Sequence, residues 1–214
     1  MRLRVYAIVT AILTWFALAL QGYLAVTLSI SNGKTLVAGL ITFFSYFTIL
    51  TNLLVAVVLS CSARAPRAGP RAFFASVRVQ SGTAVYIAIV GIVYSLLLRD
   101  IWNPQGWQKV ADVPLHDLIP LLYVVYWVIF VRKSSLMWKH AVWWLTYPAA
   151  YFAYTLLRGA ALDWYPYPFL DANALGYSRV SMNAVMLLAA FLLTGLLVVG
   201  IGRWMGRTAT ADRA

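Results

Sequence analysis

Apolar residues fill long stretches of this sequence, and polar residues collect in the short intervals between them. A helix that crosses a membrane needs about 20 consecutive, predominantly apolar residues. Six stretches reach or approach that length. They predict transmembrane helices over about 5–28, 36–60, 81–98, 115–131, 141–157 and 180–201. The expected fold class is therefore all-α: a polytopic membrane protein built as a bundle of six transmembrane helices.

The fourth and fifth predicted helices are short, and each contains a proline. Pro120 and Pro148 lack the N–H group that a helix interior needs, so we expect kinks near both residues. No repeat of 20–50 residues is evident. We expect a single domain over 1–207, followed by a disordered tail over 208–214.

Composition supports a membrane location. Of the 214 residues, 63% are hydrophobic and only 11% are charged. A soluble domain could not cover its surface with so few charges. The net charge of +11 does not indicate a nucleic-acid partner, because the arginines lie in short intervals between apolar stretches. Lys and Arg residues in the loops between membrane helices set the orientation of those helices in the membrane.

The basic residues predict the orientation of the chain. With the N-terminus inside, the inner segments hold twelve Lys and Arg residues and the outer loops hold five. Because Lys and Arg accumulate on the cytoplasmic side, both termini are predicted to be cytoplasmic. Five of the six acidic residues then fall at or beyond the outer face.

Metal and cofactor chemistry have little basis in this sequence. Cys61 is the only cysteine, and the two histidines, His116 and His140, fall at opposite faces in the predicted topology. No Lys lies mid-helix, and no glycine loop suited to phosphate is present. We therefore expect no metal and no cofactor.

Two polar residues in separate predicted helices point to chemistry. Thr48 lies midway along the second helix, and His116 lies near the outer end of the fourth. If these helices are neighbours, a hydroxyl and an imidazole share one cavity that opens toward the outer face. This pair is the minimum equipment for a nucleophile and its base. Thr48 and His116 are the candidate catalytic residues.

Other polar residues fall on the same predicted faces. Asp112 or Asp117 could orient the imidazole, and Asn52, Ser45 or Asn183 could donate to an oxyanion. Each also has a structural interpretation, because polar side chains in membrane helices often bond their own i−4 carbonyl or join helices. The remaining candidates are expected to line the cavity: Gln21, Thr51, Tyr123 and Asn183.

Three segments together resemble a known family. They are Phe43-Phe-Ser-Tyr-Phe-Thr48-Ile-Leu-Thr-Asn52, His116-Asp-Leu-Ile-Pro120 and Tyr167-Pro-Phe-Leu-Asp171. The sequence is similar to the bacterial predicted six-transmembrane membrane proteins. These resemble the eukaryotic androgen-induced and androgen-dependent TFPI-regulating proteins, which are intramembrane threonine hydrolases of fatty-acid esters. The resemblance implies a nucleophile at Thr48 and a base at His116.

The expected function is a threonine-dependent lipid ester hydrolase of the bacterial cell membrane, with substrate entering from the outer leaflet. Its expected partners are membrane lipids, and no protein partner is predicted. The alternative is a non-catalytic six-helix protein that binds lipid or a small molecule, or a subunit of a membrane complex. A small transporter is a third interpretation, but no inverted repeat or intramembrane acid pair supports it.

Overall fold

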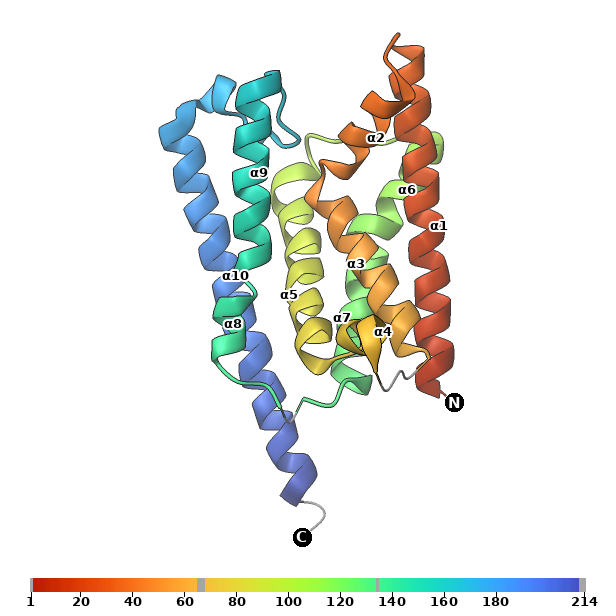
Figure 1. The fold of residues 1–214 in the computed structure, drawn as a ribbon, viewed down its shortest axis with the longest axis vertical. Coiled ribbons are helices and arrows are strands. Elements are labelled where there is room, and N and C mark those ends of the chain that lie inside the picture. The colour runs from red at the N-terminus through yellow and green to blue at the C-terminus, as the bar shows by residue number, and fades with distance from the viewer. Residues whose placement is uncertain (1, 65–67, 134, 212–214) are drawn as a thin grey trace. The chain divides into compact units, whose positions relative to one another are not determined.

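The computed structural model of the chain describes residues 2–64, 68–133 and 135–211. Within these ranges every regular element is a helix (Figure 1). The all-α class predicted from the sequence is confirmed for this part of the chain.

Four helical stretches are long and apolar enough to cross a membrane. They are α1 over Arg2–Ser31, then Val77–Leu98, Gly106–Phe130 and Ala172–Gly206. A fifth candidate is the pair α2 (Leu36–Phe44) and α3 (Phe47–Ser62), which is bent by 78°. The helices thus mark the chain as a membrane protein with four or five candidate spans, where the sequence pattern predicts six.

The fifth predicted span is divided. The sequence predicts one helix over 141–157, whereas the structure has a short α8 (Lys139–Trp143) and then α9 (Thr146–Leu162). Pro148 lies in the first turn of α9, where its missing N–H costs little. The break therefore comes before the proline, and no kink forms at it.

The bend between α2 and α3 separates two candidates that the sequence places on one helix. The Ser45 hydroxyl donates to the Ile41 carbonyl at 2.6 Å, and the Ser45 N–H bonds the Thr42 carbonyl, three residues back. Tyr46 then takes an extended conformation (φ −88°, ψ 129°), and α3 starts at Phe47. Ser45 therefore ends one helix, and Thr48 stands in the first turn of the next.

Two spans contain a π-helical turn, in which hydrogen bonds join residues five apart. In the first, α5 (Val77–Val93) continues into η1 (Tyr94–Leu98). In the second, α6 (Gly106–Val113) continues through η2 (Pro114–Leu118) into α7 (Ile119–Phe130). Single π turns inside α-helices are frequent at functional sites.

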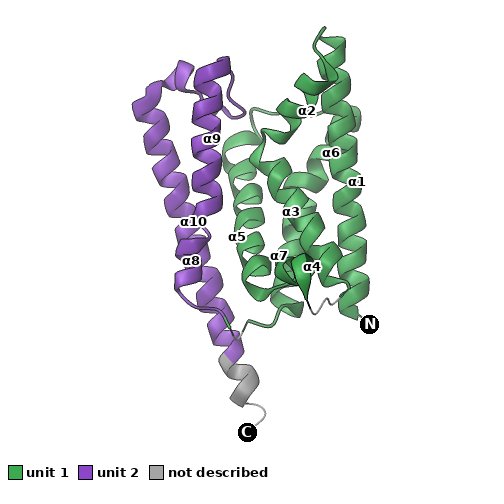
Figure 2. Ribbon diagram, viewed as in Figure 1, with its two compact units in different colours: residues 1–135 green, residues 136–214 purple. Residues whose placement is uncertain are grey.

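The chain divides into two compact units, residues 1–135 and residues 136–214 (Figure 2). In the first unit, α1 packs against α2, α3, α6 and α7, while α5 packs against α3 and α7. Its core is aliphatic and aromatic. Fully buried members of that core include Val55, Leu59, Ile87, Leu115, Ile119 and Tyr123.

The first unit also contains α4 (Gly69–Phe74), which lies in the interval 61–80 between the second and third predicted helices. In the second unit, α10 (Ala172–Ala211) packs against α8, α9 and the short η3 (Pro168–Leu170). Gly176 interrupts α10 with φ 75°, ψ 153°. The helix continues to Ala211, past the predicted start of the tail at 208, and residues 212–214 lie outside the described residues.

In the second unit, the end of α9 is shaped by a glycine. The ring of Tyr165 packs directly against the backbone of Gly159, so closely that a Cβ atom there would overlap the ring. Asp163 lies between them in the left-handed region (φ 50°) and reverses the chain. The turn after α9 therefore depends on the absence of a side chain at position 159.

We predict that Gly159→Ala destabilises the protein by about 1–3 kcal/mol, the usual cost of overpacking. Thermal unfolding of the detergent-solubilised protein measures this. Gly200→Ala is the control, because a Cβ there would only touch Trp138 at 3.7 Å. Alanine in a helix should then be neutral or favourable by up to about 1 kcal/mol. Equal melting temperatures for the two variants would contradict this account of the turn.

Candidate active site

The site is organised around a buried carboxylate, that of Asp112 at the end of α6. Asp112 is only 3% exposed. Its Oδ2 accepts a hydrogen bond from the Tyr94 hydroxyl at 2.5 Å, and its Oδ1 accepts one from the Trp102 indole at 3.1 Å. His116 Nδ1 lies 3.1 Å from Oδ1. A carboxylate withdrawn from water is stable only with such partners, so three side chains are fixed around Asp112.

His116 belongs to η2 and is held on two sides. Its Nδ1 lies 3.1 Å from the Asp112 backbone carbonyl as well as from the carboxylate. Its ring stacks on Tyr94, with 4.0 Å between centroids and 15° between planes. Because both neighbours of Nδ1 are acceptors, Nδ1 carries the proton in the neutral ring. The lone pair then lies on Nε2, which is the arrangement of a general base.

The sequence leaves open whether Asp112 or Asp117 orients the imidazole, and the geometry assigns this position to Asp112. Asp117 pairs with Arg99, just beyond the end of η1. The hydrogen bond to Asp117 raises the pKa of the Arg99 guanidinium above its usual value. This pair is exposed, so its contribution to stability is small. The Arg99–Asp117 pair nevertheless connects the end of η1 to η2.

Thr48 reaches the histidine segment through a neighbour, Asn52. The Asn52 side-chain amide donates to the Thr48 carbonyl at 2.9 Å and to the Leu115 carbonyl at 3.1 Å. Leu115 directly precedes His116 in the chain. Asn52 is fully buried and Thr48 is 7% exposed. One nitrogen atom therefore links the backbone at the candidate nucleophile to the backbone at the candidate base.

The need for this link follows from the π turn and from Pro120. Leu115 would normally accept a bond from the Ile119 N–H, but that group donates to Pro114 instead. The next residue, Pro120, has no N–H to offer. The Leu115 carbonyl thus has no backbone donor in its own helix, and Asn52 supplies one. Pro120 by itself would leave the His116 carbonyl, four residues back, without its usual donor, and the shifted register of the π turn adds the Leu115 carbonyl to the groups that need one.

Gly91 lets α5 approach the same turn closely. A Cβ atom at position 91 would lie 3.3 Å from the His116 carbonyl oxygen and 3.3 Å from Pro120. Both contacts are tighter than side chains normally make, so a larger residue would push η2 away. The glycine therefore keeps Tyr94, one turn further along, close enough to stack on His116.

The remaining predicted residues have specific places. Ser45 is buried and donates to Ile41, and Gln21 on α1 accepts a bond from Gln108 on α6 at 2.8 Å. Tyr123 donates to the Gln80 carbonyl at 3.1 Å, in the core. Thr51 is fully buried on α3. Asn183 belongs to the second unit, where it donates to the Phe169 carbonyl at 2.8 Å.

These contacts remove two candidates for the oxyanion role. Both hydrogens of the Asn52 amide point to backbone carbonyls, and the Ser45 hydroxyl donates within its own helix. Neither group has a proton left for a developing oxyanion. In the structure they support the backbone around the site.

Sequence reasoning missed Tyr94, Trp102 and Arg99. Aromatic residues near the ends of apolar stretches are typical of membrane interfaces, so they gave no separate signal. A buried aspartate needs hydrogen-bond donors. A search for donor side chains near residues 99–105, the loop before Asp112, would have found Tyr94 and Trp102. Among the described residues, no cluster of His, Cys and acidic side chains could hold a metal ion.

Comparison of the chain with protein-family models, with curated proteins and with solved structures found no match. The chemistry of the site therefore has to be argued from its own residues.

We predict that Asn52→Ala destabilises the protein by about 1–3 kcal/mol, because the buried Leu115 carbonyl loses its donor. Pro120→Ala returns a backbone N–H to this turn. The cost of Asn52→Ala should therefore be smaller in the Pro120→Ala background, by at least about 0.5 kcal/mol. The free energies of unfolding of the wild type, the two single variants and the double variant form a double-mutant cycle that measures this difference. Strict additivity would contradict the role assigned to Asn52.

Proposed function

We propose that this protein is an intramembrane hydrolase of lipid esters, related to the threonine hydrolases that its sequence resembles. The observation that carries the proposal is the arrangement of Asp112 and His116. A buried carboxylate on Nδ1 of a histidine is the pattern that prepares Nε2 to accept a proton. The Asp112 carboxylate holds the imidazole of His116 at Nδ1, and the Tyr94 ring stacks on its face.

In the proposed reaction, the Thr48 hydroxyl attacks the acyl carbonyl of the ester while His116 Nε2 takes its proton. The tetrahedral intermediate collapses, the ester C–O bond breaks, and His116 returns the proton to the leaving alcohol. A water molecule, deprotonated by the same nitrogen, then cleaves the acyl-threonine. This second step releases the fatty acid and restores Thr48.

Asp112 acts on this reaction through His116. Its carboxylate keeps the ring in one tautomer and stabilises the imidazolium that forms when Nε2 is protonated. Tyr94 and Trp102 hold the carboxylate in place by their hydrogen bonds. They are positioning residues, one step further from the substrate.

The start of α3 is the source of oxyanion stabilisation that we propose. Thr48 lies in the first turn of this helix, directly after the 78° bend. The N-terminal end of a helix carries partial positive charge, which favours a negative charge that develops beside it. A straight helix over 36–60 would have placed Thr48 in its middle, where this effect is absent.

The substrate class and location are part of the proposal. The candidate residues lie in apolar helices, so we expect an ester with long acyl chains that reaches the site through the lipid phase. With both termini in the cytoplasm, the site opens toward the outer leaflet of the bacterial cell membrane. The excess of Lys and Arg in the inner segments supports this orientation.

A non-catalytic lipid-binding protein is the second candidate. It is favoured by the way Asn52 and Tyr123 donate to backbone carbonyls of other helices, as residues that join helices do, while Ser45 donates to the i−4 carbonyl of its own helix. On this interpretation Asp112 and His116 form a structural cluster. The two candidates differ in whether the Thr48 hydroxyl is reactive.

We predict that the purified protein reacts with a fluorophosphonate probe and hydrolyses long-chain esters, and that Thr48→Ala abolishes both. His116→Ala should lower turnover by about 10²–10⁴-fold, the usual contribution of a general base. Asp112→Asn should also lower turnover, by perturbing the tautomer. Ester hydrolysis by each variant in detergent is the measurement.

Thr14→Ala is the matched control for these variants. Thr14 is a buried threonine on α1 whose hydroxyl donates to the Thr10 carbonyl, so its loss should leave turnover unchanged. Turnover by Thr48→Ala at the wild-type rate would rule out this nucleophile. Absence of labelling and hydrolysis in the folded wild-type protein would favour the lipid-binding candidate.

The orientation is tested with single cysteines, after Cys61 is replaced by serine. Ala68 and Gln105 are both exposed, one before α4 and the other before α6. We predict that a membrane-impermeant maleimide labels Gln105→Cys in intact cells and labels Ala68→Cys only after the membrane is opened. The opposite pattern would reverse the topology and place the site toward the inner leaflet.

A further inference from the structure

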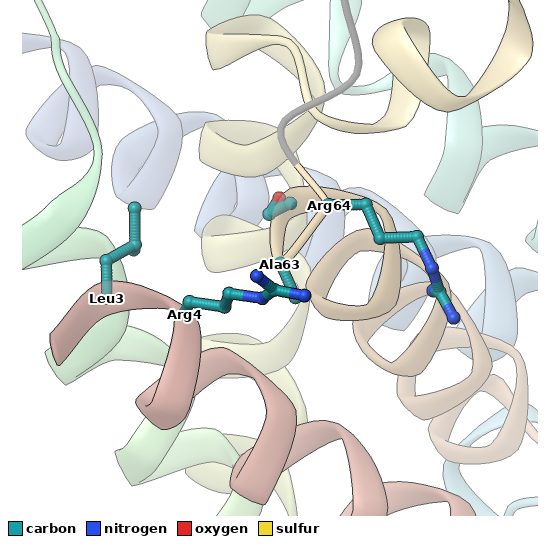
Figure 3. A pocket seen from close by; sticks show the side chains of 5 residues that line it. Leu3, Arg4, Ala63 and Arg64 are labelled. Atoms are coloured by element: carbon teal, nitrogen blue, oxygen red, sulfur yellow. The ribbon is translucent and has the colours of Figure 1, made fainter. Parts of the chain in front are cut away.

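A basic pocket lies at the far end of the first unit from His116. It is formed where α1 begins and α3 ends, and it is lined by Leu3, Arg4, Ser62, Ala63 and Arg64 (Figure 3). Its volume is about 310 Å³, near the lower limit of ligand sites. The proposed hydrolase mechanism uses none of these residues.

The two arginines of this pocket have no carboxylate to neutralise them. Among the described residues, Arg99 pairs with Asp117 and His116 with Asp112, and neither Arg4 nor Arg64 belongs to these pairs. The described carboxylates of the first unit all lie between residues 100 and 117. Arg4 precedes Gln21 by 17 residues of α1, which is about 25 Å along the helix. Because Gln21 bonds to α6 near Asp112, the arginines are distant from every one of these acids.

One of the arginines is held in place by the protein. Arg64 Nη1 donates to the Ser60 carbonyl at 3.0 Å, in the last turn of α3. A guanidinium group has five N–H donors, so the others remain for a ligand. Arg4 extends from α1 toward Ala63, so both guanidinium groups belong to the lining of the pocket (Figure 3). The pocket thus offers hydrogen-bond donors with positive charge, which is the chemistry that recognises phosphate.

The position of the pocket indicates where the phosphate comes from. It lies at the end of the apolar α1 span, and Leu3 gives its rim an apolar side that is 39% exposed. A phospholipid presents this combination, a phosphate beside an acyl chain. We propose that the pocket binds the phosphate of an anionic phospholipid. The inference does not depend on the proposed hydrolase activity.

Native mass spectrometry of the detergent-solubilised protein tests this proposal, with phosphatidylglycerol and phosphatidylcholine of identical acyl chains. We expect the wild-type protein to retain phosphatidylglycerol over phosphatidylcholine by at least about fivefold, the effect of one well-placed arginine. In the double variant Arg4→Gln/Arg64→Gln this preference should disappear. Both side chains are exposed, so the variant should keep its helical circular dichroism.

Arg71→Gln is the matched control. Arg71 is an exposed arginine on α4 that does not line the pocket, and its substitution removes one positive charge, as does either single pocket variant, Arg4→Gln or Arg64→Gln. It should keep the wild-type preference. An equal loss in Arg71→Gln and in a single pocket variant would overturn the proposal, because it would show a general effect of net charge.

Inorganic phosphate separates a lipid from a soluble ligand. Added at millimolar concentration, it should leave most of the phosphatidylglycerol bound, since it lacks the acyl chains. Complete displacement by inorganic phosphate would overturn the lipid assignment in favour of a soluble phosphate compound. A wild-type protein with no preference between the two lipids would overturn the site itself.

Discussion

The first unit depends on one constraint: every backbone carbonyl in an apolar bundle must find a donor inside the protein. The constraint is most severe between Pro114 and Pro120, where a π turn and a proline together deprive the Leu115 carbonyl of a backbone partner. Asn52 meets the need from another helix. The interaction that completes the hydrogen bonding of one span therefore also fixes α3 against η2. Thr48 comes to lie beside the histidine segment as a result.

A second buried group, the Asp112 carboxylate, organises the other side of the same turn. The cost of burying it is met by Tyr94 from η1, by Trp102 from the connecting loop and by His116 from η2. These donors come from three successive segments, so satisfying one carboxylate closes the hairpin between two spans. Gly91 allows the close approach that this requires. The same contacts that satisfy the buried carboxylate also place it on Nδ1 of His116, the contact from which the proposed base is argued.

The sequence predicted the helical class and most helix positions because apolar length and basic intervals are strong signals over 20 residues. It did not predict the bend at Ser45, since no proline or glycine marks it and the break arises from local side-chain hydrogen bonding. The π turns could not be predicted either. A π turn adds one residue to a helical turn, and in a stretch that is apolar throughout, this addition leaves the pattern of apolar residues unchanged. Among the site residues, Asp112 was one of two equal candidates. Only the geometry showed that Asp117 is directed to Arg99.

The charges of the first unit are separated along its length, and this separation connects its two sites. The described carboxylates gather around His116, while Arg4 and Arg64 stand at the opposite end of α1 without acidic partners. Pairing Asp112 with an arginine would have neutralised the carboxylate, so its partners are neutral donors and a histidine. Arginines at the end of a membrane span are attracted to anionic lipid headgroups. The same distribution leaves Asp112 in contact with His116 and without an arginine partner, and leaves Arg4 and Arg64 without a carboxylate, which is the basis of both proposals.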